Sequence, residues 1–384
     1  MIRWIKNYCK WWSYKQKVAR RLASWDKKGG GIHAPEQIKQ HELLSRPSFN
    51  PAPPNAPIFQ DAHYRLMLPV RDAAPHREYV YHVRQPCFIE PEFGYVIMEP
   101  SILIPESLAW SYWARIPEKM HYFSGAPSLK ALEEARNGKT KMRQEPIVIS
   151  LRHVFDDNYG HCLIHLMSSL MLMDETGVSP EIPIVVSPKL GRMPFFQEMI
   201  TRGSLKTRRW IVQGEEYIHA QEVIFGVTEW PSRNLLNSFL DQIDVPEANP
   251  AGRKRLFILR RSRQLRSMEA LVPILDAFGF ECIRPEEYTF AQQITLFSEA
   301  EIVCGALGAA LTNVIFRRGL KTTVLEIQAS NERDMFFYDL AKTCGYSHRH
   351  LIGSRYETAD RYSNFSVEPD RFRALLQSGV ASLQ

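Results

Sequence analysis

Two histidines four residues apart, His161 and His165, have the spacing in this 384-residue chain that most directly suggests catalysis. Residues at i and i+4 share one face of a helix, and an imidazole there can remove a proton from an acceptor hydroxyl. The pair could instead bind zinc, although neither a third ligand nor the glutamate of an H-E-x-x-H motif accompanies it. The two rings could also be buried structural groups. Asp156 and Asp157, just before the expected helix, could bind Mg²⁺ or cap the helix.

Residues 255–259, with the apolar run 256–259, predict a strand. Four arginines follow it: Arg260, Arg261, Arg263 and Arg266. Guanidinium groups at the carboxyl end of a parallel strand can hold a diphosphate through paired hydrogen bonds. The alternative is a solvated basic loop.

A third cluster is the small-residue segment 304–313, CGALGAALTN, which is followed by a strand ending at Glu326. A strand that runs into small residues and then a helix lets backbone N–H groups approach an anion. An acidic residue at the end of the next strand suits the two hydroxyls of a ribose. Small residues also allow tight packing between strand and helix. The pattern alone therefore fits either an anion-binding loop or a tightly packed connection.

The elements that must position these clusters follow an α/β rhythm. Strands alternate with helices through residues 146–227 and again through 255–344, whereas residues 78–104 predict several short strands. Short links between alternating elements favour parallel, doubly wound sheets, which bind ligands at the carboxyl ends of their strands. A break rich in proline and glycine at 245–252 separates the two halves.

The fold class predicted from these patterns is α/β, with two Rossmann-like domains facing each other across a cleft. We assign residues 1–45 to a helix and linker, 46–245 to an N-terminal domain, and 253–352 to a C-terminal domain. Residues 353–384 are expected to form a tail or helix that packs back on the N-terminal domain.

The charge of the chain is concentrated at its start. The formal net charge is +6, but residues 1–28 carry nine basic side chains and one acid, which makes this segment +8 and the rest −2. Trp4, Trp11, Val18 and Leu22 fall on one face of a helix, opposite most of the basic residues. This amphipathic pattern predicts a helix that lies on an anionic membrane surface. A solvated helix and a nucleic-acid contact are the alternatives, although the near-neutral body argues against nucleic acid.

Composition excludes several other classes of protein. The six cysteines form no C-x-x-C pair and no zinc-type spacing, so we expect no disulfide framework and a reducing cytoplasmic location. No uninterrupted apolar run reaches the roughly 18 to 20 residues that a membrane-spanning helix needs. Lys10 and Lys15 stand where the apolar centre of a signal peptide would lie.

Taken in order, the three clusters resemble glycosyltransferase family 61, which includes plant xylosyltransferases, extracellular O-GlcNAc transferases and bacterial enzymes of capsular polysaccharide synthesis. The resemblance covers residues 150–350. Asn158-Tyr159-Gly160-His161 resembles the family's Asn-Tyr-x-His motif, and residues 308–313 with Glu326 resemble its closing loop and acid. The intervening resemblance involves Phe257, Ile258, Leu259, Arg260, Arg266, Glu269, Phe280, Gln293, Phe297 and Ala300.

The resemblance implies a GT-B-like architecture in which the C-terminal domain holds a nucleotide sugar. It implies inversion at the anomeric carbon with no metal and no other cofactor, the donor being a UDP-linked co-substrate. The implied catalytic residues are His161, His165 and Asp157, with His161 as candidate base. The implied donor-binding residues are Arg260, Arg266, Gly305, Gly308, Thr312, Asn313 and Glu326.

The function implied is transfer of a sugar to a growing capsular or cell-surface polysaccharide or glycolipid, by an enzyme at the cytoplasmic face of the membrane. The expected acceptor is an oligosaccharide or a lipid-linked glycan. Three positions depart from the family pattern: Leu307 replaces its histidine, His165 a common aspartate, and Gln292 a glutamate. A pyruvyl or other group transferase, or a non-catalytic scaffold of an assembly complex, remains the alternative.

Overall fold

The protein folds into two compact units, which are described separately. The computed structural model describes residues 42–48, 76–99, 101–104, 107–108, 127–228, 230–266, 268–332, 334–358, 360 and 362–383. Unit 1 contains the described residues up to Pro231, and unit 2 begins at Ser232. The amphipathic helix expected in residues 1–28 lies outside the described residues.

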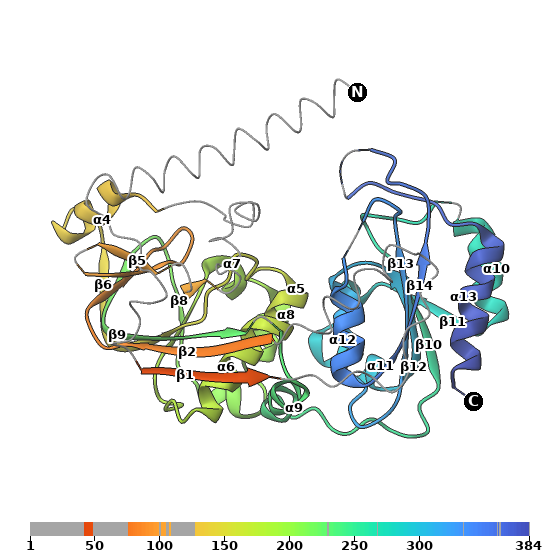
Figure 1. Ribbon diagram of the computed structural model, residues 1–384, viewed down its shortest axis with the longest axis horizontal. Helices are drawn as coiled ribbons and strands as arrows, with labels where there is room; N and C mark the ends of the chain where they lie inside the picture. Colours follow the sequence, from red (N-terminus) through yellow and green to blue (C-terminus); the bar gives the residue numbers. More distant parts are fainter. Residues whose placement is uncertain are drawn as a thin grey trace. The chain divides into compact units, whose positions relative to one another are not determined.

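Unit 1 is built on a nine-stranded mixed sheet (Figure 1). Its strands are β1 (Glu42–Ser48), β2 (His76–Val83), β3 (Cys87–Ile89), β4 (Val96–Met98), β5 (Ile102–Ile104), β6 (Met142–Ser150), β7 (Ile184–Val186), β8 (Trp210–Val212) and β9 (Tyr217–Thr228). Strands β9, β6, β7 and β8 pair in parallel, while β1 to β5 join by antiparallel pairing. The short strands predicted within 78–104 are confirmed, and their pairing makes this sheet mixed rather than fully parallel.

One helix of unit 1, residues 159–175, carries the paired histidines. It consists of α5 (Tyr159–His161), a π-helical turn η4 (Cys162–Leu166) and α6 (Met167–Glu175). The helix packs closely on β9 because Gly226 has no side chain: a Cβ there would lie 2.9 Å from the backbone oxygen of Ser169. The other helices of the unit are α4 (Leu129–Arg136), α7 (Pro188–Gly191), α8 (Pro194–Met199) and the 3₁₀ segment η5 (Gly203–Thr207).

Unit 2 is built on a five-stranded sheet in which every pairing is parallel. Its strands are β10 (Lys254–Ile258), β11 (Phe280–Ile283), β12 (Ala300–Ala306), β13 (Thr323–Gln328) and β14 (Ser347–Ile352), in the spatial order β11-β10-β12-β13-β14. This is the doubly wound order 2-1-3-4-5, whose direction of winding reverses between β10 and β12. Ligands of such sheets bind outside the carboxyl ends of the strands at this point.

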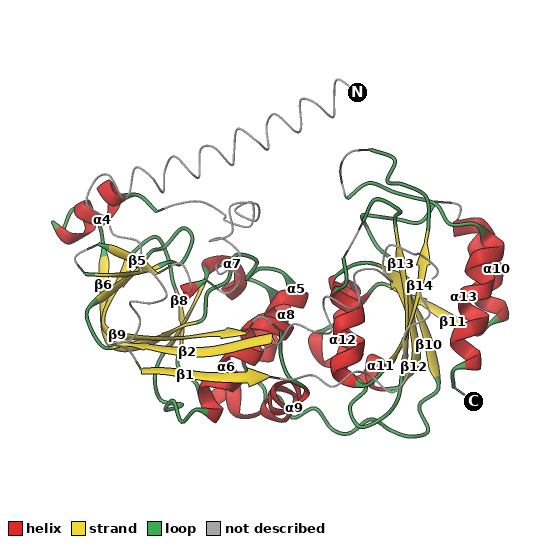
Figure 2. Cartoon of the chain, in the orientation of Figure 1, coloured by secondary structure: helices red, strands yellow, loops and turns green. Residues whose placement is uncertain are grey.

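Helices cover both faces of the unit 2 sheet, with α10 and α13 on one face and α11 and α12 on the other (Figure 2). Both faces are therefore buried, which explains why every residue of β12 and β13 is buried. The helices are α9 (Arg233–Gln242), α10 (Met268–Ala277), α11 (Phe290–Ser298), α12 (Phe336–Cys344) and α13 (Pro369–Ala381), with the 3₁₀ segments η6 (Pro285–Glu287) and η7 (Ala309–Phe316).

The C-terminal segment differs from its prediction. Residues 353–384 were expected to pack back on the N-terminal domain, but α13 packs against α10, β13 and β14. The ring of Phe372 contacts that of Phe257 edge-on at 5.9 Å, so this helix completes the core of unit 2. Unit 2 also begins earlier than the break expected at 245–252, because α9 is part of it.

Helix α11 shows why one departure from the family pattern leaves the local structure intact. The hydroxyl of Thr289 accepts from the backbone N–H of Gln292, and the side-chain oxygen of Gln292 accepts from the N–H of Thr289. A capping box of this kind uses glutamine as well as glutamate at its third position. Gln292 therefore begins the helix as a glutamate would.

Two composition-based expectations have a structural counterpart. The five described cysteines are free thiols, in agreement with the absence of a disulfide framework. None of the helices in the described part of the chain has the length and apolarity that crossing a bilayer requires.

Candidate active site

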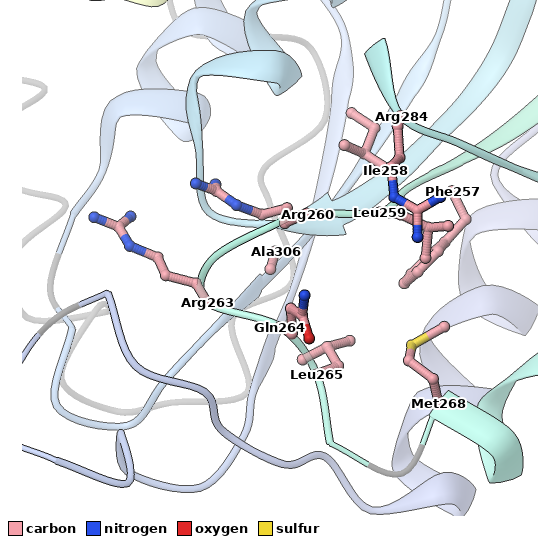
Figure 3. A pocket seen from close by; sticks show the side chains of 10 residues that line it. All are labelled: Phe257, Ile258, Leu259, Arg260, Arg263, Gln264, Leu265, Met268, Arg284 and Ala306. Carbon is pink, nitrogen blue, oxygen red and sulfur yellow. The ribbon is translucent and has the colours of Figure 1, made fainter. Parts of the chain in front are cut away.

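Two loops meet where the winding of the unit 2 sheet reverses. The loop after β10 carries Arg260 and Arg263, and the segment after β12 carries Leu307. A guanidinium nitrogen of Arg260 donates to the backbone oxygen of Leu307, and Nη1 of Arg263 donates to the same oxygen at 3.3 Å. The two guanidinium groups extend from their loop in the same direction (Figure 3). Two arginines of the predicted cluster thus lie against the predicted small-residue segment.

This pair of arginines is an excess of buried positive charge. The side chain of Arg263 is only 7% exposed, and burial together with repulsion from Arg263 lowers the pKa of Arg260 to about 10. Within the described residues, neither arginine forms a salt bridge with a carboxylate. Two partly desolvated cations without an acidic partner attract an anion, and guanidinium groups are suited to phosphate oxygens.

Glycine at 308 is what makes room for Arg260. A Cβ at this position would lie 1.1 Å from Nη1 of Arg260, so any side chain would displace the guanidinium. Gly305 has a different role, because a Cβ there would lie 3.1 Å from Cβ of Ile258 on the neighbouring strand. Of the two glycines predicted to bind the donor, Gly308 leaves space for the guanidinium of Arg260, and Gly305 leaves space for the side chain of Ile258.

A pocket of about 120 Å³ adjoins the arginine pair. Its wall includes Phe257 and Ile258 of β10, Arg284 directly after β11, and Ala306 at the end of β12, and Figure 3 labels all of its residues. The pocket therefore lies at the carboxyl ends of three adjacent parallel strands, where this class of sheet binds ligands.

Arg266, predicted to hold the diphosphate beside Arg260, has another partner. Its Nε and Nη2 donate to the two carboxylate oxygens of Glu357 at 2.5 and 2.8 Å, at an exposed position. These bonds raise the pKa of Arg266 and lower that of Glu357. Arg263 is the arginine that the structure brings beside Arg260.

Thr312 and Asn313 lie on η7 and are fully buried. Nδ2 of Asn313 donates to Oε1 of Gln293 on α11 at 3.0 Å, which fixes the segment after β12 against that helix. Gln293 in turn donates to the backbone oxygen of Tyr288. Asn313 thus links the segment after β12 to α11.

Glu326, predicted to bind a ribose, is buried inside the sheet. Its Oε1 accepts from Nε2 of Gln328 at 2.7 Å, and its Oε2 lies 2.9 Å from Nε2 of His348. Burial raises the pKa of Glu326 to about 7 and lowers that of His348 to about 3. Both oxygens are thus occupied by neighbours within unit 2.

We expect Glu326→Gln to stabilise the protein, and to do so more as pH rises. The folded-state pKa lies above the unfolded one, so the folded chain binds more protons between pH 4.5 and 7 and its free energy of unfolding falls across that window. Glutamine resembles the protonated acid. The gain in the free energy of unfolding from Glu326→Gln, measured by urea unfolding, should be small at pH 5 and reach on the order of 3 kcal/mol at pH 8.

The matched control is Glu281→Gln, at an exposed position on β11, which should change the free energy of unfolding by less than about 0.5 kcal/mol at either pH. An advantage of Glu326→Gln that stays the same from pH 5 to pH 8 would refute the raised pKa.

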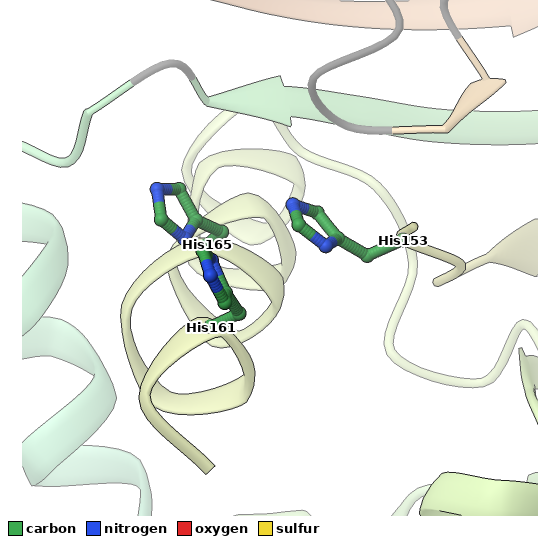
Figure 4. A group of neighbouring side chains, drawn as sticks. All are labelled: His153, His161 and His165. Atoms are coloured by element: carbon green, nitrogen blue, oxygen red, sulfur yellow. Dashed lines mark hydrogen bonds between the residues drawn. The ribbon is translucent and has the colours of Figure 1, made fainter. Parts of the chain in front are cut away.

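Three histidines gather in unit 1. His161 and His165 come from successive turns of the 159–175 helix, and His153 follows directly on β6 (Figure 4). Nδ1 of His161 lies 3.2 Å from Nδ1 of His165, and the ring centroid of His153 lies 5.3 Å from that of His161 and 5.5 Å from that of His165. The predicted pair is confirmed on one helix face, and His153 joins it.

Local structure holds this cluster in place. The side chain of Asn158 caps the helix by accepting from the N–H groups of Gly160 and His161, as the expected helix start near Asn158 requires. The π-helical turn between the two histidines is a distortion that often marks functional sites. Trp230 packs edge-on against the ring of His165.

Burial keeps these histidines uncharged. It lowers the pKa of His161 to about 4, and it holds the pKa values of His153 and His165 well below the ordinary value. A neutral imidazole has a free lone pair, so His161, the most exposed of the three, can accept a proton from a hydroxyl.

Two acidic residues, Asp156 and Asp157, precede the helix. Asp156 is buried and pairs with Arg152, Nε to Oδ2 at 3.3 Å. Asp157 is half-buried, and within the described residues no hydrogen bond joins it to a histidine.

Two residues of these clusters, His153 and Arg263, were not predicted as site residues from the sequence. His153 lies just after the carboxyl end of a parallel strand, where α/β sheets often carry ligand-binding residues. It was not predicted because it precedes the helix that carries His161 and His165. Arg263 is one of four arginines in the loop, and no local sequence pattern distinguishes it from Arg266. The contact of Glu326 with His348 depends on the pairing of β13 with β14, for which the sequence contains no local motif.

The comparison with protein families agrees with this geometry. Residues 159–325 match the family model described as Glycosyltransferase 61. The match begins at the histidine helix and ends one residue before Glu326. It therefore contains His161, His165 and the arginine pair, whereas His153 lies before it. No curated protein sequence matches the chain.

Proposed function

The chain carries a glycosyltransferase family 61 domain, and from this premise we propose that it transfers a sugar, with inversion and without a metal ion, from a UDP-linked donor. The observation that carries the proposal is the pair Arg260 and Arg263, at the point where the unit 2 sheet reverses its winding. Arg260 is partly buried, Arg263 is buried, and in the described part of the chain neither forms a salt bridge with a carboxylate. We propose a GT-B arrangement in which unit 2 holds the nucleotide sugar.

In the proposed reaction an acceptor hydroxyl attacks the anomeric carbon opposite the departing diphosphate. The bond from that carbon to the phosphate oxygen breaks as the bond to the acceptor oxygen forms, and inversion follows from this in-line geometry. The guanidinium groups of Arg260 and Arg263 stabilise the negative charge that develops on the diphosphate. Thr312 and Asn313 support the segment that presents Gly308.

The acceptor proton passes to His161. In the proposed mechanism Nε2 of His161 receives this proton, while Nδ1 faces Nδ1 of His165 at 3.2 Å. His165 fixes the ring of His161 through this contact and is a positioning residue in the proposed mechanism. The proposed acceptor is a growing capsular or cell-surface glycan, as an oligosaccharide or attached to a lipid.

A screen of common nucleotide sugars tests the proposal, with release of the nucleoside diphosphate and the mass of the product as readouts. Transfer of a hexose or pentose unit supports it, and an added pyruvyl group would replace it with a different transferase reaction. Nucleotide binding without turnover on any donor or acceptor would favour the non-catalytic scaffold, an alternative that the replacement of the family's histidine by Leu307 keeps open.

We also propose that residues 1–28 hold the enzyme on the cytoplasmic face of the cell membrane, where a lipid-linked acceptor would lie. Removing residues 1–28 should weaken binding to vesicles that contain anionic lipid at least about tenfold, because each basic residue near the surface contributes on the order of 1 kcal/mol. Sedimentation with vesicles measures this, and neutral vesicles are the control. Unchanged sedimentation of the truncated chain would contradict the proposed anchor.

A further inference from the structure

The three histidines of unit 1 are close enough to share one ion. The nitrogen atoms that His153, His161 and His165 can offer all lie within 4.8 Å of one another, and those of His161 and His165 are 3.2 Å apart. Nitrogens bound to one tetrahedral zinc ion, each at about 2.1 Å from it, lie roughly 3.4 Å apart. The helix pair already has this separation, and His153 needs to approach by about 1.4 Å.

The elements that carry the rings suit this arrangement. His161 and His165 are fixed on one helix face, whereas His153 lies in the loop after β6 and faces them from the other side (Figure 4). A helix pair with a third ligand from a loop leaves one tetrahedral position for water or another ligand. His153 and His165 are buried, and the partly exposed His161 provides the entry side.

The chemistry of the three donors selects the ion. Imidazole nitrogen suits zinc, cobalt, nickel and copper, whereas magnesium and calcium prefer oxygen, and no carboxylate belongs to this set. We propose that His153, His161 and His165 form a binding site for one divalent transition-metal ion.

Two hydrogen bonds have to change when the ion binds. Nδ1 of His153 accepts from the backbone N–H of Phe155 at 2.9 Å, and Nε2 is the nitrogen offered to the ion. Binding moves the ring proton of His153 from Nε2 to Nδ1 and turns the N–H of Phe155 away. The proton between Nδ1 of His161 and Nδ1 of His165 moves to Nε2 of the ring that carries it. Three metal–nitrogen bonds outweigh two neutral hydrogen bonds, so these changes do not prevent binding.

Metal binding and proton transfer exclude one another at this site, a consequence that rests on the proposed function. An ion on Nδ1 of His161 leaves the ring proton on Nε2, the nitrogen that would receive the acceptor proton. The bound ion is therefore an inhibitor, and the metal-free protein is the active form.

Cobalt tests the site directly, because tetrahedral Co²⁺ absorbs visible light. The full chain, treated with a chelator and free of any histidine tag, is titrated with Co²⁺ alone and then with Zn²⁺ as competitor. We expect one tetrahedral Co²⁺ per chain. His153→Gln and, separately, the less buried His161→Gln should each weaken binding by at least about 100-fold, since changes to groups beyond the direct ligands already cost 10- to 100-fold.

His219→Gln is the matched control, because His219 lies in the same unit but bonds to Gln144 and Glu99. It should bind Co²⁺ as the unchanged chain does. Thermal unfolding without metal checks that each variant is folded. The absence of the tetrahedral spectrum, or a spectrum that a folded His153→Gln variant retains, overturns the site.

Turnover separates this inference from the proposed function. Zn²⁺ should inhibit transfer, and a chelator should restore it. Co²⁺ binding in a chain that turns over no donor would leave the metal site standing and refute the proposed reaction. Full turnover with the site occupied would overturn the inhibitory role.

Discussion

Arg260→Ala is expected to weaken binding of a nucleoside diphosphate on the order of 100-fold. A hydrogen bond to a charged group contributes up to about 3 kcal/mol, and the guanidinium of Arg260 is partly buried beside a second cation. Calorimetric titration with UDP measures the loss. The fold should not suffer, because removing Arg260 also relieves its repulsion with Arg263.

The control for this variant lies six residues further along the same loop. Arg266→Ala removes a guanidinium with the same charge but breaks only the exposed pair with Glu357. Exposed ion pairs contribute at most about 1 kcal/mol, so UDP affinity should change by less than about fivefold. Equal losses in the two variants would mean that UDP binding responds to net charge rather than to the paired arginines after β10.

His161→Ala is expected to lower kcat about 10²- to 10⁴-fold, the usual contribution of a general base. Because the arginine pair belongs to the other unit, the affinity for UDP should stay unchanged, and the loss should appear in turnover alone. Both measurements use chelator-treated protein so that bound metal does not mask the effect.

His219→Ala serves as the control for removing an imidazole from unit 1, and it should retain full turnover. His165→Ala should lose less than His161→Ala, since its proposed role is to position the base. Full turnover in both the His161 and the His165 variant would show that the base is another residue.

Where the signals were local, the sequence predicted the structure well. The apolar run ending at Ile258, the small residues of 304–313 and the capping residue Thr289 each specify their element through contacts within a few residues. The parallel sheet of unit 2 follows from the alternation of such elements. The helix that begins after Asn158 was predictable for the same reason.

The features that the sequence did not predict depend on contacts between residues far apart along the chain. Arg266 pairs with Glu357, which lies 91 residues further along the chain, and no local pattern predicts this contact. His153 reaches the histidine pair only because β6 ends beside the helix. The mixed pairing of the unit 1 sheet and the position of α13 likewise depend on contacts between distant segments, for which single-residue patterns carry no signal.

The contact between Gly308 and Arg260 has an evolutionary consequence. A Cβ at 308 and the guanidinium of Arg260 compete for the same space, so an alanine at 308 forces this flexible side chain to another position. Once position 260 holds a short side chain, the same alanine displaces nothing there. The effect of a change at 308 therefore depends on the residue at 260, which is epistasis set by volume.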